Sequence, residues 1–472
     1  MTHSFDTVIR NGRVVTPTAV MTVDIAMQGG KIAAIGPDLP PARQEIDAAD
    51  KWVMPGGVDP HAHIEQMSGM GLMNADTFET ATRSAALGGT TSVISFVAQP
   101  KGARLPDCMG DYFARAKRGA MIDYAFHMIV SDTTVADFES DLKALIGAGH
   151  RSIKVFTTYN IRLTDDDILR TMAIAKEAGA LVCVHAETDA ILTRAKAELL
   201  QAGKTAPHFH AQSHPRMAEI EAIERMCRFA EWLGQPVMIF HVSTKEGADA
   251  VRAARKRGAP VWSETCPHYL FMTEDILQKE GLEGAKWMCS PPQRAHADQE
   301  ALWDAIADGT IQIVSSDHAP YRFDKTGKLS AGPNARFDQI ANGLPGLETR
   351  LPLMFDAMVS RGRGGALAFA RLTAGAPAAH YGLQNKGELA IGKDADVVLW
   401  DETRVTTYGE DDLHDNVGYN PWVGTTVRGW PTDVWLRGNH IVSDAKIFAS
   451  AGSGQWIERS NMALPTAPPY EG

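Results

Sequence analysis

Short runs of apolar and β-branched residues alternate through the middle of the chain with longer, Ala-rich stretches. This alternation is typical of strand–helix units in a parallel sheet. It predicts eight strands, at Trp52–Ile64, Ser92–Ala98, Tyr124–Val130, Ser152–Tyr159, Leu181–Glu187, Pro236–Ser243, Val261–Tyr269 and Ile311–Pro320. The predicted helices include Ala75–Leu87, Asp165–Glu177, Met217–Leu233 and Gln299–Asp308. Eight units over about 300 residues predict a (β/α)8 TIM barrel, with an open doubly wound sheet as the alternative.

The two ends of the chain have a different pattern of apolar residues and turn signals. Residues 7–53 alternate β-rich runs with the turn signals Asn11-Gly12 and Gly29-Gly30, which predict hairpins in a small antiparallel unit. Similar runs return late, at Ala395–Asp401 and Val434–Asn439. Neither end is large enough to bury a core alone, and the ends of a chain commonly lie close together. We therefore predict one β-sandwich from residues 1–54 and 385–446, a catalytic barrel over 55–384, and a C-terminal tail over 447–472.

Composition narrows the class of protein. The chain has 472 residues, 44% of them hydrophobic, and its formal net charge of -11 is spread along the sequence. That balance argues against nucleic acid or an anionic membrane as a partner. No apolar run approaches the roughly 20 residues of a membrane span, and the first residues lack a secretory signal pattern. The five cysteines form no CxxC pair, which is typical of reduced thiols in a cytoplasmic protein.

Metal-ligand residue types stand at the ends of the predicted strands. His61 and His63 end the first strand, His185 the fifth, His241 the sixth, and Asp317 the eighth. Because side chains alternate along a strand, two histidines separated by one residue point to the same face. A lone His-x-His is more often a surface or core feature than a metal site. The combined nitrogen and oxygen set, however, predicts a zinc ion or a similar divalent cation.

Lys154 is a basic residue in an otherwise apolar fourth strand. Burial and nearby metal ions both disfavour the charged ammonium group and lower the pKa of a lysine. A neutral amine can add carbon dioxide to give a carbamate, an anionic ligand able to bridge two metals. The alternative is a lysine whose amine reaches solvent at the strand end. Because histidine and aspartate ligands are predicted at the same edge, we favour the carbamate.

Five short motifs together resemble the cyclic amidohydrolases, and most closely the dihydropyrimidinase and hydantoinase branch. They are His61-Ala62-His63, Lys154-Val155-Phe156-Thr157-Thr158-Tyr159, His185-Ala186-Glu187, His241-Val242-Ser243 and Ser316-Asp317-His318-Ala319-Pro320. The resemblance runs nearly end to end, since Gly392–Val397 is similar to part of that superfamily's composite β-sandwich. The combined pattern is far more specific than any single motif.

The resemblance implies two divalent metal ions, most simply zinc, and carboxylation of Lys154. The implied ligands form two sets that share this lysine: His61, His63 and Asp317 for the more buried ion, and His185 and His241 for the second. Two such ions ionise a bound water near neutral pH and polarise a carbonyl. By resemblance, Asp317 is the general base and acid. Tyr159 donates a hydrogen bond to the developing oxyanion.

Two further positions are implied to bind substrate. Ser290 and Asn342 resemble loop residues whose backbone groups pair with the cyclic amide or imide of the substrate. The alternatives are purely structural roles: Ser290 and Asn342-Gly343 would only form turns, and Tyr159 would be an aromatic residue at the barrel rim. Enzymes of this family are commonly tetramers, so the resemblance also implies a homotetramer whose C-terminal tail lies on a neighbouring subunit.

The loop after His63 bears on which ring is opened. It contains no arginine to pair with a substrate carboxylate, which disfavours a ring that carries an acid group. Its methionines and Leu72 indicate an adaptable apolar surface, or else simply pack the loop down. We therefore predict a small neutral ring, namely a dihydropyrimidine or a 5-substituted hydantoin. Gln66-Met67-Ser68-Gly69 and Ala319-Pro320 depart from the family's usual residues, so an allantoinase or a cyclic imide hydrolase stays open.

A different class of protein is also possible, because this family includes scaffold proteins that have lost metal ligands. Every implied ligand position is filled here, which favours an enzyme. The remaining histidines receive other roles. We expect His268 to line the pocket and His318 to orient the site by hydrogen bonding. His208, His210 and His214 are interpreted as surface or loop-packing residues.

Overall fold

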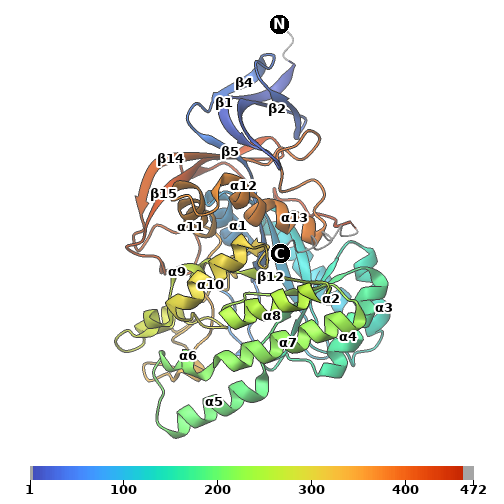
Figure 1. Ribbon diagram of the computed structural model, residues 1–472, viewed down its shortest axis with the longest axis vertical. Helices are drawn as coiled ribbons and strands as arrows, with labels where there is room; N and C mark the ends of the chain where they lie inside the picture. Colours follow the sequence, from blue (N-terminus) through green and yellow to red (C-terminus); the bar gives the residue numbers. More distant parts are fainter. Residues whose placement is uncertain (1–3, 461–472) are drawn as a thin grey trace.

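An eight-stranded parallel sheet occupies the middle of the chain in the computed structural model, which describes residues 4–460 (Figure 1). Its strands are β6 Gly57–Ala62, β7 Thr90–Ala98, β8 Asp123–Ile129, β9 Ser152–Phe156, β10 Leu181–His185, β11 Val237–Ile239, β12 Val261–Thr265 and β13 Ile313–Val314. They lie side by side in sequence order. The eight predicted parallel strands are thereby confirmed, and the doubly wound alternative is wrong because its strand order would reverse partway.

The carboxyl end of the first strand, β6, meets the segment that follows the last strand, β13. Ala62 and His318 form an isolated parallel bridge. The His63 backbone N–H donates to the His318 carbonyl at 2.7 Å, and the Ser316 hydroxyl donates to the His61 carbonyl at 3.2 Å. These contacts bring residues separated by more than two hundred positions to one edge of the sheet.

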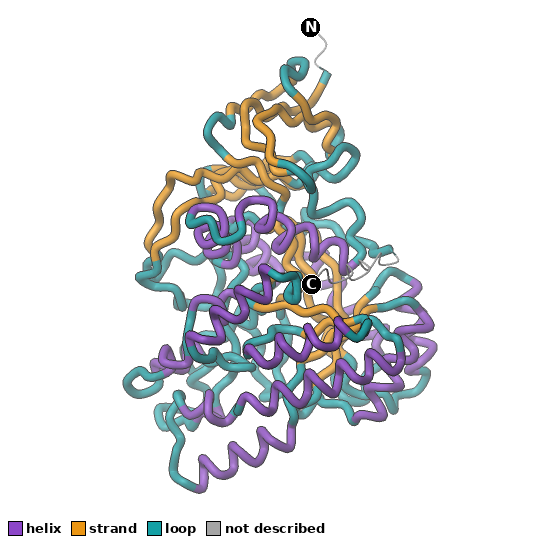
Figure 2. Tube along the Cα trace, viewed as in Figure 1, coloured by secondary structure: helices purple, strands orange, loops and turns teal. Residues whose placement is uncertain are grey.

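Helices lie in front of this sheet in the view of Figure 2. Their bounds are α1 Phe78–Leu87, α2 Leu105–Gly119, α3 Phe138–Gly147, α4 Asp165–Ala178, α5 Asp189–Gln201, α6 Phe209–Ser213, α7 Arg216–Leu233, α8 Lys245–Lys256, α9 Pro267–Phe271, α10 His296–Ala307, α11 Arg350–Phe355, α12 Gly365–Ala370 and α13 Ala376–Tyr381. Local sequence sets the bounds of α4. Thr164 accepts a hydrogen bond from the Asp167 N–H at the start, and Gly179 ends the helix in a left-handed conformation at φ 76°.

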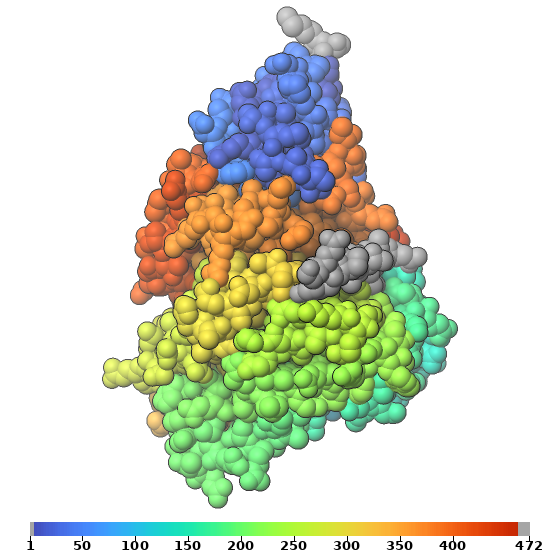
Figure 3. Space-filling model, in the orientation of Figure 1, coloured from blue at the N-terminus to red at the C-terminus, as the bar shows by residue number. Residues whose placement is uncertain are grey.

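A second sheet combines the two ends of the chain. Hydrogen bonds join nine strands: β1 Phe5–Val15, β2 Val20–Gln28, β3 Lys31–Gly36, β4 Ala42–Asp47, β5 Trp52–Pro55, β14 Val397–Thr407, β15 Thr426–Leu436, β16 Asn439–Ser443 and β17 Lys446–Ile447. The N- and C-terminal parts pair directly, with Met54 opposite Val398. Figure 3 shows the N-terminal strands at one end of the molecule, against the orange residues of the later chain. The predicted pairing of the chain ends is therefore observed.

Two local predictions at the N-terminus need correction. Asn11-Gly12 is no hairpin turn, because β1 runs through it with a bulge and Asn11 has a φ of 60°. A bulge and a tight hairpin turn can both use a left-handed residue, so the same dipeptide serves either. The unit is also not purely antiparallel, since β1 pairs in parallel with β4 and β5. Gly29-Gly30 does join β2 to β3 as predicted.

The predicted strand Trp52–Ile64 is in fact two strands in two sheets. β5 pairs with β1 and β14, whereas β6 pairs with β7, and only Gly56 separates them. A side chain at Gly56 would meet the Thr91 hydroxyl at 2.1 Å, so the crossing requires glycine. Both strands are buried and the break falls within the apolar run 52–58, which is why the pattern of residues does not reveal it.

The C-terminal segment crosses back to the parallel sheet. Trp456 forms a parallel bridge with Tyr124 of β8, and the Arg459 side chain is 1% exposed. Residues 461–472 of the predicted tail lie outside the described residues. Within residues 4–460, no helix is both long enough and apolar enough to cross a bilayer.

Candidate active site

One cavity of about 390 Å³ at the carboxyl ends of the parallel strands brings together every residue that the sequence assigned to metal binding, catalysis or substrate binding. Its lining includes His61, His63, Lys154, Tyr159, His185, His241, Ser290, Asp317 and Asn342. The volume lies in the range of pockets that enclose small ligands.

His61, His63 and Asp317 form the tightest cluster in the cavity. Nε2 of His61 lies 3.0 Å from Asp317 Oδ1, and Nε2 of His63 lies 3.5 Å from the same oxygen. Burial opposes charge on these groups. Even so, Asp317 and Glu264 raise the pKa of His61, and the two histidines hold the pKa of Asp317 well below its usual range. One atom from each of the three residues lies within 4.8 Å of the others, a spacing that a single metal ion could bridge.

Neighbouring oxygens fix which nitrogen each histidine presents to this cluster. Glu264, on β12, lies 2.5 Å from His61 Nδ1, and Gln66 Oε1 lies 2.7 Å from His63 Nδ1. Because those oxygens accept the proton on Nδ1, Nε2 is the ring nitrogen of each histidine that faces Asp317 and is available to a metal ion. Such orientation of ligands by their neighbours is typical of metal sites.

The second pair of histidines is held in the same way. Glu187 bridges two rings, with one oxygen 2.8 Å from His185 Nε2 and the other 2.8 Å from His214 Nδ1. This contact leaves His185 Nδ1 facing His241 Nε2 at 2.9 Å. Burial lowers the pKa of both His185 and His241, so both rings are neutral, as metal-binding histidines must be.

The unpaired atoms of the cavity fit a divalent cation. A lone pair on His61 Nε2 and an anionic Asp317 oxygen repel each other at 3.0 Å unless a proton or a metal ion lies between them. Among the described residues, neither His61 Nε2 nor His241 Nδ1 has a hydrogen-bond partner, although both are buried. The donor set of imidazole nitrogens and a carboxylate suits zinc or a related metal.

Lys154 lies on β9 in an aromatic environment and does not reach solvent. It is 1% exposed, and its amine lies 3.9 Å from the ring centre of Phe240 and 5.0 Å from that of Phe156. Within residues 4–460 it forms no ion pair. Burial lowers its pKa from 10.5 to about 8, against the opposing pull of Asp317 and Glu264. The alternative of a lysine extended into solvent is therefore wrong.

Tyr159, Ser290 and Asn342 form the other wall of the cavity. The Asn342 side chain donates to the Ser290 hydroxyl at 3.0 Å, and Gly343 N–H donates to the Met288 carbonyl at 2.8 Å. Burial, followed by the charge of Glu187, raises the pKa of Tyr159 well above its usual value, so the phenol keeps its proton. These contacts join the loops of Ser290 and Asn342 into one surface.

Three of the site residues have a left-handed backbone. The φ angles are 70° for Tyr159, 40° for His241 and 46° for Asp317. Non-glycine residues adopt this conformation at a cost, and such strain is concentrated at functional sites. Each residue follows the end of a strand, where the turn re-aims its side chain toward the cavity.

The remaining histidines correct and extend the interpretation of the sequence. His318 Nε2 lies 3.0 Å from Asp76 Oδ2. Neither His318 nor His268 is among the residues that line the cavity, so His268 does not line it as expected. His210 and His214 are buried, so of the two expected roles the surface one is wrong and loop packing remains.

Three supporting residues, Glu264, Glu187 and Gln66, were not singled out from the sequence. Glu264 had a detectable signal, since it is an acid in the predicted strand Val261–Tyr269 just as Lys154 is a base in its own strand. Glu187 was visible only as part of the His185-Ala186-Glu187 motif.

The loop that follows His63 forms part of the cavity rim. Met67 and Met73 face each other in a short antiparallel bridge, and Met70 lines the cavity. Met67, Met70 and Met73 are 50%, 49% and 43% exposed. Because these side chains are about half exposed, packing within the loop is not their only role.

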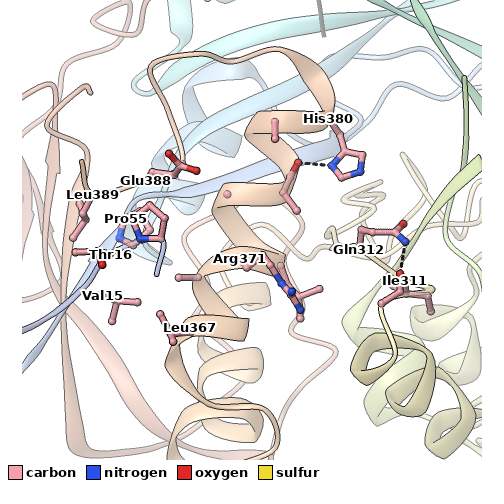
Figure 4. Close-up of a pocket in the computed structure, with 18 of the residues that line it drawn as sticks. Val15, Thr16, Pro55, Ile311, Gln312, Leu367, Arg371, His380, Glu388 and Leu389 are labelled. Atoms are coloured by element: carbon pink, nitrogen blue, oxygen red, sulfur yellow. Dashed lines mark hydrogen bonds between the residues drawn. The ribbon is translucent and has the colours of Figure 1, made fainter. Parts of the chain in front are cut away.

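A second cavity, also of about 390 Å³, lies at the amino ends of the strands, beside β12 and β13 (Figure 4). Its lining is mainly apolar and includes Trp262, Ile311, Leu367, Leu372 and Leu389. Figure 4 shows the ring of His380 hydrogen-bonded to its own helix, where Nδ1 donates to the Ala376 carbonyl at 2.7 Å.

Known proteins resemble this chain along almost its whole length. The amidohydrolase family matches residues 52–441. The D-hydantoinase of Ralstonia pickettii is 38% identical over 457 residues, which cover 96% of this chain and 99% of that protein. The D-phenylhydantoinase of Escherichia coli O81 (strain ED1a) is 37% identical over 462 residues, covering 97% and 99%. The crystal structure of dihydropyrimidinase from Brevibacillus agri superposes with a TM-score of 0.94 at 36% identity, covering 97% and 99%.

Proposed function

The chain belongs to the amidohydrolase family, in its hydantoinase and dihydropyrimidinase branch, and on this basis we propose that it hydrolyses the cyclic amide of a dihydropyrimidine or a 5-substituted hydantoin to an N-carbamoyl amino acid. One observation carries the proposal. Four histidines, a buried lysine and an aspartate from five strand ends line the same cavity as Tyr159, Ser290 and Asn342. Within residues 4–460, no arginine lines that cavity, so no guanidinium is available there to pair with a carboxylate on the ring.

We assign two divalent ions, most simply zinc, to this cavity. His61, His63 and Asp317 would hold one ion and His185 and His241 the other, with Lys154, carboxylated by carbon dioxide, as the shared ligand. When bound, the ions polarise the ring carbonyl and lower the pKa of a water molecule toward neutrality. The depressed pKa of Lys154 supports its carboxylation, because only the neutral amine attacks carbon dioxide.

The chain's own residues supply the proton transfers and the orientation of the ring. Asp317 stays ionised because its pKa is low, so it can accept a proton and then deliver it to the departing amide nitrogen. Tyr159 keeps its proton and donates a hydrogen bond where negative charge develops on the carbonyl oxygen. Ser290 and Asn342 pair with the amide or imide edge of the ring.

The architecture is part of the proposal. The contact between the ends of β6 and β13 supports a closed (β/α)8 barrel over residues 55–384. The shared sheet of β1–β5 and β14–β17 supports a β-sandwich from residues 1–54 and 385–446, followed by a tail over 447–472. We also propose that the protein is a homotetramer in the cytoplasm and that neither nucleic acid nor a membrane is its partner.

A substrate panel tests the reaction. The protein is loaded with zinc and incubated with dihydrouracil, 5-phenylhydantoin, allantoin and succinimide, with and without a chelator. We expect turnover of the first two rings, formation of N-carbamoyl amino acids, and loss of turnover on chelation. Preference for allantoin or succinimide would assign the chain to an allantoinase or cyclic imide hydrolase. A purified protein that binds no metal would instead indicate a scaffold.

A further inference from the structure

Two buried side chains contact the backbone directly behind Ser290 and Asn342. His210 Nε2 lies 2.7 Å from the carbonyl oxygen of Cys289, the residue before Ser290. The Lys328 amine lies 3.0 Å from the carbonyl oxygen of Ala341, the residue before Asn342. His210 is 2% exposed and Lys328 is 0% exposed. The same kind of contact therefore occurs behind both residues assigned to substrate binding.

Each of these carbonyls belongs to the peptide group whose N–H lies on Ser290 or Asn342. Within residues 4–460, neither N–H donates a hydrogen bond to the protein. Both residues line the cavity, so these two donors are available to a ligand. A hydrogen bond accepted by a peptide carbonyl polarises the group and strengthens donation from its N–H.

Lys328 also ties the two loops to each other. Its amine lies 3.3 Å from the Met288 carbonyl, which in turn accepts the N–H of Gly343 at 2.8 Å. A fully buried ammonium is costly, and an apolar side chain of the same length would avoid that cost. Hydrogen bonds to the backbone carbonyls of the two loops offset that cost and explain why a lysine is buried at this position.

The chemistry of the two donors agrees with these contacts. A carbonyl oxygen can only accept, so the neutral His210 ring must carry its proton on Nε2. Burial lowers the pKa of His210 to about 3 and that of Lys328 to about 7. The imidazole therefore acts as a neutral donor, and the amine can donate in either protonation state.

We infer that His210 and Lys328 are positioning residues for substrate: each fixes and polarises one peptide group, so that the N–H groups of Ser290 and Asn342 bind the acceptor atoms of a cyclic amide. The inference rests on the proposed function, because it needs the cavity to bind such a ring. It gives the histidine of α6 and a loop lysine a role in affinity, with no contact to the reacting atoms.

Kinetics of the metal-loaded full chain test the inference with dihydrouracil. We expect K328M and H210L each to raise KM about tenfold, the effect of weakening one hydrogen bond, with kcat and bound metal nearly unchanged. H210Q, which restores an N–H donor, should recover most of the lost affinity. Because Lys328 also contacts the Met288 carbonyl in the loop of Ser290, the two effects are coupled, and the double variant should raise KM more than either single variant but by less than the product of their effects.

H380L is the matched control, because His380 is also a buried histidine that donates to a backbone carbonyl, but at the amino ends of the strands. Its KM should equal that of the wild type. If K328M and H210L lower the melting temperature but leave KM unchanged, the two residues are merely structural and the inference is wrong. If K328M does not fold, the comparison of H210L with H210Q decides alone.

The inference and the proposed function can fail separately. A zinc-loaded wild type that turns over no cyclic amide refutes the function. In that case, calorimetric titration of the same loaded proteins with dihydrouracil judges the inference. An affinity order of wild type above H210Q above H210L supports it, and equal affinities, or no binding by the wild type, refute it.

Discussion

At the carboxyl ends of the parallel strands, a cavity gathers four histidines, a lysine and an aspartate, whereas a cavity of equal volume at the amino ends is lined mainly by apolar side chains. Volume therefore does not separate a functional site from a gap between packed elements. What separates them is the number of buried polar groups that converge on one point. At the amino ends, His380 Nε2 is a buried nitrogen that has no hydrogen-bond partner among residues 4–460. At the carboxyl ends, the buried Nε2 of His61 lies 3.0 Å from Asp317, in the cavity that His241 also lines.

Replacing Lys154 is the strongest test of this contrast. K154A removes the shared ligand, so bound metal should be lost and kcat/KM should fall by on the order of 10³ or more, the scale of losing a catalytic group. Metal analysis and turnover of dihydrouracil measure both effects. Full retention of metal and activity would exclude the carbamate assignment.

The oxyanion donor should give the next largest effect. Y159F removes one hydroxyl and should lower kcat by about 10²–10³-fold, the range found for such donors. Metal content should not change, because Tyr159 is not among the proposed ligands. A rise in KM alone would show that Tyr159 only binds the ring.

Glu264 tests whether the support behind the ligands matters. E264Q keeps the shape but weakens the contact with His61 Nδ1, and metal affinity should fall about 10–100-fold. Competition with a chelator of known affinity measures it. Unchanged affinity would mean that β12 contributes only packing.

The pKa of Lys154 makes carboxylation depend on pH. Because the pKa in the folded protein is about 8, the neutral fraction rises from roughly 3% at pH 6.5 to roughly 75% at pH 8.5. Metal-free protein should therefore recover activity about tenfold faster or more at the higher pH, at constant dissolved carbon dioxide and zinc. Recovery that is independent of pH would indicate an unmodified lysine.

Changes at the amino ends should have the smallest effect. H380L alters the apolar cavity, and it should leave kcat/KM for dihydrouracil within about twofold and metal content unchanged, as for most changes away from a site. A loss as large as that of E264Q would show that the two ends of the sheet are coupled.

The sequence predicted those parts of the site that strand periodicity determines. His61, His63, His185, His241 and Asp317 stand at the ends of apolar runs, and parallel strands bring such ends to one edge. Glu264 follows the same rule and could have been recognised as an acid in a buried strand.

Other features depend on tertiary packing that no local pattern contains. Lys328 lies in a loop, and His210 lies in a helix of five residues. Neither segment is long enough to show a periodic pattern of apolar residues, so the burial of these side chains follows only from how distant segments pack. The break at Gly56 was hidden because both sheets bury the same kind of residue. Asn11-Gly12 was ambiguous because one backbone conformation serves both a bulge and a turn.

The crossing at Gly56 has a consequence for anyone who wishes to trim or graft this protein. Strand β5 is hydrogen-bonded into the nine-stranded sheet, and after one intervening residue the chain enters the strand that carries His61. A minimal catalytic unit that begins at residue 57 would free that strand from its tether and leave β14 with an open edge. The nine-stranded sheet is thus an anchor for the metal ligands rather than a detachable appendage, and shortened versions should keep both chain ends.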